Sequence, residues 1–203
     1  MRLESLTDLQ VDALREVGSI GAGHAATALS QLMGIPISVR NPELEIVPIG
    51  EMPGVFGGPE QLVGAVFLRL LGDIEGGMLF LAPRDALLSL VDLMHAREPG
   101  TTKSFGREQE ALVTHVASVL GASYVAAIAR MADLNVLPST PSFALDMAGA
   151  ILEVATAEAG MKAQNAMLIR TAFHHEGTKI DVALFFLPDQ DSLGVLLGRL
   201  GIA

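Results

Sequence analysis

Two pairs of polar side chains, each pair three residues apart, carry the chemistry that this sequence offers. Glu16 and Ser19 form the first pair, and His115 and Ser118 form the second at an offset of 99 residues. Side chains three residues apart lie on the same side of an α-helix. The first pair offers a carboxylate and a hydroxyl, which suit contact with another molecule. The second pair offers a base beside a hydroxyl, as in a hydrolytic dyad.

A hydrolytic dyad is the less favoured interpretation of His115 and Ser118. No acidic residue that would orient the imidazole is identifiable, and the sequence has no strained turn of the kind that exposes a nucleophilic serine. We therefore interpret His115 as a surface histidine and Ser118 as a small residue that permits close approach of another helix.

Both pairs lie on long segments that repeat each other, residues 14–32 and 113–131. Each segment has apolar residues at helical spacing, which predicts an amphipathic helix. Its other side carries short side chains where a solvated helix would have Lys, Glu and Gln, as if a large partner must lie close. We call these sides the short-chain faces. They comprise Asp12, Glu16, Ser19, Gly23, Thr27 and Ser30 in the first segment, and Ala111, His115, Ser118, Ala122, Ala126 and Ala129 in the second.

Capping residues and apolar stripes define the two helices. Thr7 and Gln10 form a capping box, while Gly34 and Pro36 end the pattern, so the first helix is expected over residues 8–33 and the second over 105–132. The residues expected in the core are Leu14, Val17, Gly21, Ala25, Ala28 and Leu32, and then Val113, Val116, Leu120, Tyr124, Ala127 and Met131.

The same order of elements follows each long helix, and the motifs FLAP (80–83) and FFLP (185–188) end two hairpins. We expect an α+β fold in which both hairpins join one antiparallel sheet. The two long helices lie side by side on it, in two layers, with their short-chain faces outward. The chain is then one domain of two pseudo-twofold halves, about 1–98 and 104–203. The other elements expected are extended chain at 35–39 and 44–49, a loop at 50–59, strands at 62–70, 77–82, 165–173 and 179–187, helices at 84–96 and 191–200, and a strand and helix within 143–157.

Composition limits the class of protein. Of 203 residues, 50% are hydrophobic and 4% are aromatic, so the core consists mainly of aliphatic side chains. The net charge of −10 argues against nucleic acid or an anionic membrane as a partner. The absence of cysteine excludes disulfides and thiolate chemistry. No secretion signal and no uninterrupted run of 18 apolar residues is found, so we expect a soluble, cytoplasmic protein.

Two further patterns have less favoured ligand-binding interpretations. Gly18, Gly21 and Gly23 resemble a phosphate-binding loop, but they lie within the helical pattern and no strand precedes them. Helix packing explains them better. The His-His-Glu run at 174–176 suggests a metal site, but neighbouring residues of a strand point to opposite faces. We expect solvated turn residues there and no metal ion.

Residues 14–30, LREVGSIGAGHAATALS, resemble the signature of the CheC family of chemotaxis phosphatases. That signature has Glu, two residues, Asn and then a glycine-rich run, and it recurs in a second copy. The motif GDIEG at 72–76 and the Leu-Asp-Met segment at 145–147 extend the resemblance over nearly the whole chain. The resemblance implies a protein that removes phosphate from the aspartyl phosphate of the response regulator CheY. Some members also bind the receptor deamidase CheD. No metal or other cofactor is implied in this chain, since the Mg²⁺ belongs to the receiver domain.

The family pattern is altered at the residues that matter for catalysis. Glu16 matches the family acid, which pairs with a receiver lysine, but Ser19 stands where the family has the Asn that orients water. In the second copy His115 replaces the acid and Ser118 replaces the Asn, and His24 replaces a later Asn of the glycine-rich run. A misplacement of about 1 Å can cost on the order of a hundredfold in rate. We therefore expect weak activity at the first copy and none at the second.

The resemblance also suggests which surfaces bind partners. The alternative to a phosphatase is a non-catalytic protein of this family that binds a receiver domain or CheD. The Leu-Asp-Met segment at 145–147 resembles the part of the family that binds CheD. An ordinary amphipathic element with one exposed acid has the same pattern, and both interpretations stay open. The residues expected to bind partners are Asp12, Gly23 and Thr27 for the receiver, and Asp146, Met147 and Ala150 for CheD.

Overall fold

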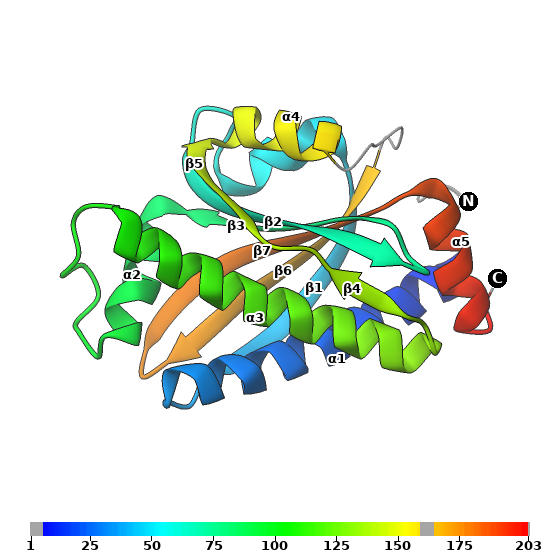
Figure 1. Cartoon of the computed structure of the whole chain (residues 1–203), viewed down its shortest axis with the longest axis horizontal. Helices are drawn as coiled ribbons and strands as arrows, with labels where there is room; N and C mark the ends of the chain where they lie inside the picture. The colour runs from blue at the N-terminus through cyan, green and yellow to red at the C-terminus, as the bar shows by residue number, and fades with distance from the viewer. Residues whose placement is uncertain (1–5, 159–164, 203) are drawn as a thin grey trace.

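The computed structural model describes residues 6–158 and 165–202, which form one antiparallel sheet with helices on both faces (Figure 1). The elements in chain order are α1 (Asp8–Met33), β1 (Ser38–Pro48), the 3₁₀ helix η2 (Ile49–Phe56), β2 (Leu62–Gly72), β3 (Gly76–Pro83), α2 (Arg84–Met94), α3 (Arg107–Ala132), β4 (Val136–Pro138), β5 (Ser142–Met147), α4 (Ala148–Glu158), β6 (Asn165–His175), β7 (Thr178–Pro188) and α5 (Gln190–Arg199).

The described sheet has seven strands in the order β1-β6-β7-β3-β2-β4, with β5 also paired to β2. The hairpins β2–β3 and β6–β7 meet at the centre, where β3 pairs with β7. The strands outside the hairpins cross over: β1 pairs with β6, and β4 and β5 pair with β2. The predicted α+β class and single antiparallel sheet are confirmed. The crossed pairing ties the two repeats of the chain together.

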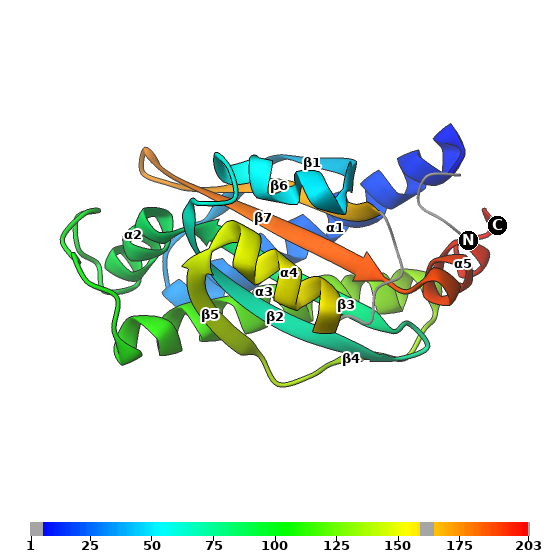
Figure 2. The same ribbon diagram turned by 90° about the horizontal axis from the view of Figure 1, so that it is seen from above.

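Helices cover both faces of the sheet. α1 and α3 lie side by side on one face and run in opposite directions, while α4 and η2 cover the other face (Figures 1 and 2). A larger apolar core lies under the long helices and a smaller one under α4 and η2. The expected two layers are therefore wrong. The reason lies in strands such as β7, which buries every residue over 182–188 and so has two apolar faces that need cover.

The ends of α1 follow from groups that satisfy its backbone. The Gln10 N–H donates to Thr7 Oγ1 (3.4 Å) and the Thr7 N–H donates to Gln10 Oε1 (2.9 Å), which confirms the predicted capping box. The Gln10 side chain also donates to the carbonyl of Ile202, which ties the start of α1 to the far end of the chain. Gly34, with a φ of 67°, ends the helix in the left-handed conformation that glycine adopts readily.

α1 and α3 come close together at Gly21. A Cβ built there would lie 2.4 Å from Cδ1 of Tyr124, so only glycine leaves room for the ring. Tyr124 is buried, and burial raises the pKa of its hydroxyl, which has no hydrogen-bond partner in the described part of the chain. Burying a hydroxyl without a hydrogen-bond partner costs free energy, so Tyr124 stabilises the fold through burial of its ring rather than through its hydroxyl. The predicted packing role of the glycine-rich run is confirmed at Gly21.

Several local predictions differ from the structure. The extended pieces expected at 35–39 and 44–49 form one strand, β1, and Ala28, expected in the core, is half-buried. Residues 49–56 form η2 instead of a loop, because Met52 is fully buried and anchors the segment in the smaller core. α3 begins at Arg107 rather than at residue 105, because Phe105 lies before the helix and stacks on Phe143 of β5, with ring centroids 5.5 Å apart. Met131 is 38% exposed, since other residues fill the core at the end of α3.

α3 is the one described helix that is long and apolar enough, by length and composition alone, to cross a membrane. Half of its most apolar stretch is buried inside the fold, where the helix packs on α1 and the sheet. Its apolar character is therefore that of a core helix whose outer face consists largely of alanine.

Asp92 of α2 anchors the connector that leads to α3. Its fully buried carboxylate accepts hydrogen bonds from the N–H groups of Thr101 (2.9 Å) and Thr102 (3.0 Å) and from the Thr102 hydroxyl. Burial by itself would raise the pKa of Asp92. The hydrogen bonds from Thr102, Thr101 and Gly100 favour the ionised form, and the net pKa lies below the usual value.

Replacing Gly21 with Ala should destabilise the protein by about 1–3 kcal/mol, because the new methyl group would displace the buried Tyr124 ring. Urea unfolding measures the change. Gly23→Ala is the matched control, since Gly23 lies in the same helix with nothing within 4 Å of a built Cβ. That variant should gain up to about 1 kcal/mol from helix propensity. Equal effects of the two substitutions would contradict the packing role of Gly21.

Replacing Asp92 with Asn should destabilise the protein by roughly 1–3 kcal/mol at neutral pH, because the charged acceptor is lost. The folded pKa of Asp92 is lowered, so its contribution is present above the ordinary value of 3.8 and disappears as the pH falls through the folded pKa. The difference between wild type and variant should therefore shrink in unfolding titrations as the pH is lowered below 3.8. Asp85→Asn is the control, since Asp85 is exposed in the same helix. An equal loss in that variant would argue against a specific anchor.

Candidate functional site

The short-chain face of α1 is open to solvent. Its members Asp12, Glu16, Ser19, Gly23 and Thr27 are all exposed and recur at steps of three or four residues along one side of the helix. α1 presents them because its opposite stripe is buried against α3 and the sheet. The predicted outward orientation of this face is confirmed.

Ser30 departs from the rest of this face. It is half-buried, and its hydroxyl oxygen accepts a hydrogen bond from the N–H of Ile37 at 2.9 Å. Ser30 therefore joins the end of α1 to the chain that leads into β1, and the exposed face ends at Thr27.

Glu16 and Ser19 have no partner inside the described protein. Asp12 pairs with Arg15 at 2.8 Å, and the Thr27 hydroxyl donates to the Gly23 carbonyl at 3.0 Å. Over residues 6–158 and 165–202 the structure records no ion pair for Glu16 and no side-chain hydrogen bond for Glu16 or Ser19. A carboxylate and a hydroxyl one helical turn apart are thus available to another molecule.

The second copy on α3 has different chemistry. His115 is exposed, but the Ser118 hydroxyl is half-buried and donates to the carbonyl of Thr114 in its own helix at 2.6 Å. This bond occupies the hydroxyl proton that a base would have to remove, so the geometry does not support a Ser–His dyad. An open depression of about 630 Å³ adjoins the copy, and its lining includes Arg107, Glu110, Thr114, His115, Ser118 and Pro141.

The two copies lie toward opposite ends of the helix pair, because α1 and α3 are antiparallel (Figure 1). Gly21 faces Tyr124 near the middle of both helices. Glu16 lies five residues to one side of this contact, and His115 lies nine residues to the other. At 1.5 Å per residue the two copies are roughly 20 Å apart along the helices, so they cannot form one site.

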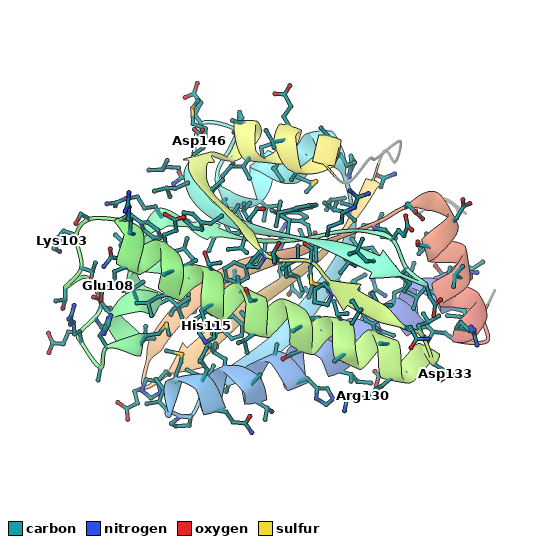
Figure 3. The ribbon with its side chains drawn as sticks, viewed as in Figure 1. Lys103, Glu108, His115, Arg130, Asp133 and Asp146 are labelled. Carbon is teal, nitrogen blue, oxygen red and sulfur yellow. The ribbon has the colours of Figure 1, made fainter. Side chains whose placement is uncertain are left out.

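The segment around Asp146 lies elsewhere, at the junction of β5 with α4 on the other side of the sheet (Figure 3). Asp146 and Met147 are exposed, and Asp146 Oδ1 accepts a hydrogen bond from the Met147 N–H at 2.8 Å. A groove of about 300 Å³ adjoins them, and its lining includes Phe67, Ala144, Asp146, Ala150 and Val154. The sequence analysis missed this groove, because its walls come from β2, β3, β5 and α4 and no local pattern links them.

No group of three or more His, Asp or Glu side chains in the described ranges is arranged to hold a metal ion. His174 and His175 lie at the end of β6 rather than in the turn, and His175 Nδ1 is 2.9 Å from the carbonyl oxygen of Pro36. Glu176 and Gly177 form the turn itself. The contact with Pro36 gives His175 a structural role, and Glu176 has a role in the turn, so neither residue needs a metal ion to explain it.

Solved structures define the class of fold. Thermotoga maritima FliY aligns with a TM-score of 0.80 over 97% of this chain and 98% of that chain, at 15% identity. A chain of the CheX–CheY–BeF3–Mg²⁺ complex from Borrelia burgdorferi aligns with a TM-score of 0.54 over 85% of this chain and 97% of that chain, at 13% identity. At such identities the likeness shows the fold alone, which is one known from chemotaxis and flagellar switch proteins.

The sequence comparisons then show the family. The pattern of the CheC-like family matches residues 9–46, which span α1 and most of β1. The CheY-P phosphatase CheC of Bacillus subtilis strain 168 is 30% identical over 196 residues, covering 95% of this chain and 94% of that relative. This chain belongs to the CheC-like family, as the resemblance at residues 14–30 predicted.

Proposed function

We propose that this chain binds a phosphorylated receiver domain of the CheY type through the short-chain face of α1 and accelerates hydrolysis of its aspartyl phosphate. The observation that carries the proposal is the pair Glu16 and Ser19, exposed one helical turn apart without internal partners. Family membership supports it, since the Bacillus subtilis relative is named a CheY-P phosphatase. A chain of the same fold has also been crystallised in a complex that includes CheY.

The proposed reaction needs few groups from this chain. A water molecule attacks phosphorus in line, the bond from phosphorus to the aspartyl oxygen breaks, and inorganic phosphate and a free carboxylate result. Positioning and charge stabilisation supply most of the catalysis of phosphoryl transfer. Glu16 holds the receiver by pairing with a cationic side chain, and the Ser19 hydroxyl hydrogen-bonds the attacking water. The Mg²⁺ ion is carried by the receiver, and this chain needs no cofactor of its own.

The activity is proposed to be weak and confined to α1. The Ser19 hydroxyl is about one bond shorter than the Asn side chain that the family uses, so water is held less accurately. At the second copy, His115 supplies no carboxylate and the Ser118 hydroxyl is bound to Thr114. We therefore propose one working site in each chain.

A non-catalytic binding protein is the second candidate. It would keep the receiver-binding face, or would bind a CheD-type deamidase, without turnover. The exposed Asp146 beside the groove of about 300 Å³ favours a protein partner on that side of the sheet. The net charge of −10 disfavours nucleic acid and anionic membranes, and we propose a cytoplasmic location in either case.

The first prediction of the proposal concerns phosphate release. The protein, mixed with a phosphorylated CheY-type receiver and Mg²⁺, should release phosphate faster than the receiver alone. Glu16→Ala should lose most of this gain, about tenfold or more, because an interfacial ion pair is removed. Ser118→Ala is the control and should keep the wild-type rate. An unchanged rate in Glu16→Ala would contradict the role of α1, and absence of any complex would favour the deamidase partner at Asp146.

Restoring the family amide gives a second test. Ser19→Asn should raise the rate of phosphate release by about ten- to a hundredfold, because the longer side chain reaches the attacking water. Ser118→Asn is the matched control and should gain nothing, since His115 stands where an acid is needed. If Ser19→Asn binds the receiver as wild type does but releases no more phosphate, the face only binds and the second candidate function is favoured.

A further inference from the structure

Arg130, which the sequence analysis did not single out, lies at the same end of the helix pair as Glu16. The contact between Gly21 and Tyr124 sets the alignment of the two antiparallel helices. Glu16 precedes Gly21 by five residues, and Arg130 follows Tyr124 by six. At 1.5 Å per residue both are displaced from the contact by roughly 8–9 Å in the same direction. Figure 3 places Arg130 toward the C-terminal end of α3 and His115 toward its other end.

The guanidinium of Arg130 is free to meet another molecule. The side chain is exposed, and its Nε donates a hydrogen bond to the carbonyl of Ala126 at 3.3 Å. No ion pair of Arg130 is recorded in the described ranges, not even with Asp133 three residues further on. Arg107 at the start of α3 likewise has no ion pair recorded in the described residues, so Arg130 is distinguished by its place at the same end of the helix pair as Glu16.

The second copy has no cation at the position equivalent to Arg130 and no acid at the position equivalent to Glu16, although Arg107 and Glu110 line the depression beside it. Gln31 occupies the position 99 residues before Arg130, just as Glu16 lies 99 residues before His115. By the repeat, Gln31 lies at the end of the helix pair where His115 lies, and Arg130 lies at the end where Glu16 lies. An acid and a cation therefore accompany each other at the end where the hydroxyl of Ser19 is free.

We propose that Arg130 is a specificity residue of the α1 site, which lets this chain prefer a phosphorylated receiver over an unphosphorylated one. The inference rests on the proposed function. The ligand chemistry is a dianionic phosphoryl group with the acidic side chains around it, which Arg recognises through charge and through its planar fork of N–H donors. Glu16 holds a cationic side chain of the same partner, so the two charges fix its orientation on the helix pair.

The experiment measures dissociation constants for a CheY-type receiver with Mg²⁺, with and without beryllofluoride as the phosphoryl mimic. Wild type should bind the beryllofluoride form more tightly. Arg130→Gln should reduce this preference by about tenfold or more, since a hydrogen bond to a charged group is lost. Arg130→Lys should retain part of it, because the charge remains while the fork does not. A purely structural role would not be rescued in this way.

Arg107→Gln is the matched control, because it removes the same charge from the opposite end of α3, where Arg107 is also exposed. Its preference should equal that of wild type, and equal losses in the two variants would overturn the proposal in favour of a general charge effect. If Glu16→Ala weakens binding while Arg130→Gln keeps the preference, the role of Arg130 is overturned and the proposed function stands. If wild type binds neither form, both fail.

Discussion

The packing of the Tyr124 ring against Gly21 is the contact on which the arrangement of the helix pair depends. The ring leaves no space for a side chain at position 21, and it keeps a hydroxyl buried without a partner in the described structure. Both short-chain faces belong to these two helices, so this contact decides which residues of α3 lie beside Glu16 and Ser19. A change at Gly21 would therefore shift the candidate site without altering any residue that is proposed to contact a partner.

Crossed strand pairing lets the two repeats share one fold while their surfaces diverge. β1 pairs with β6 and β5 pairs with β2, so neither repeat can complete its part of the sheet alone. The buried stripes of α1 and α3 are held in place by this common sheet. Their outer faces carry no such constraint, and they have come to differ in charge and hydrogen bonding. The other side of the sheet also carries two different surfaces. One is an apolar groove beside α4, and the other is a depression of about 610 Å³ lined in part by the charged residues Glu43, Arg170 and Lys179.

Much of this architecture was predictable because it depends on neighbours in the sequence. The capping box at Thr7, the stop at Gly34 and the apolar periodicity gave the limits of α1 without error. The hairpins followed from strand patterns ended by Pro83 and Pro188. The exposed pair Glu16 and Ser19 was found for the same reason, since a spacing of three sets the side of a helix. The identity of a bound partner has no such local signal.

What the sequence by itself determined is therefore the set of helices and strands, the buried stripe of each helix and the residues on the face opposite. Only the tertiary structure decided which strands cross between repeats, that η2 and α4 add a third layer, and that Arg130 lies at the same end of the helix pair as Glu16. These features join residues far apart in the chain. Their placement depends on filling two apolar faces of one sheet and on the fit of one ring against one glycine, which no local pattern encodes.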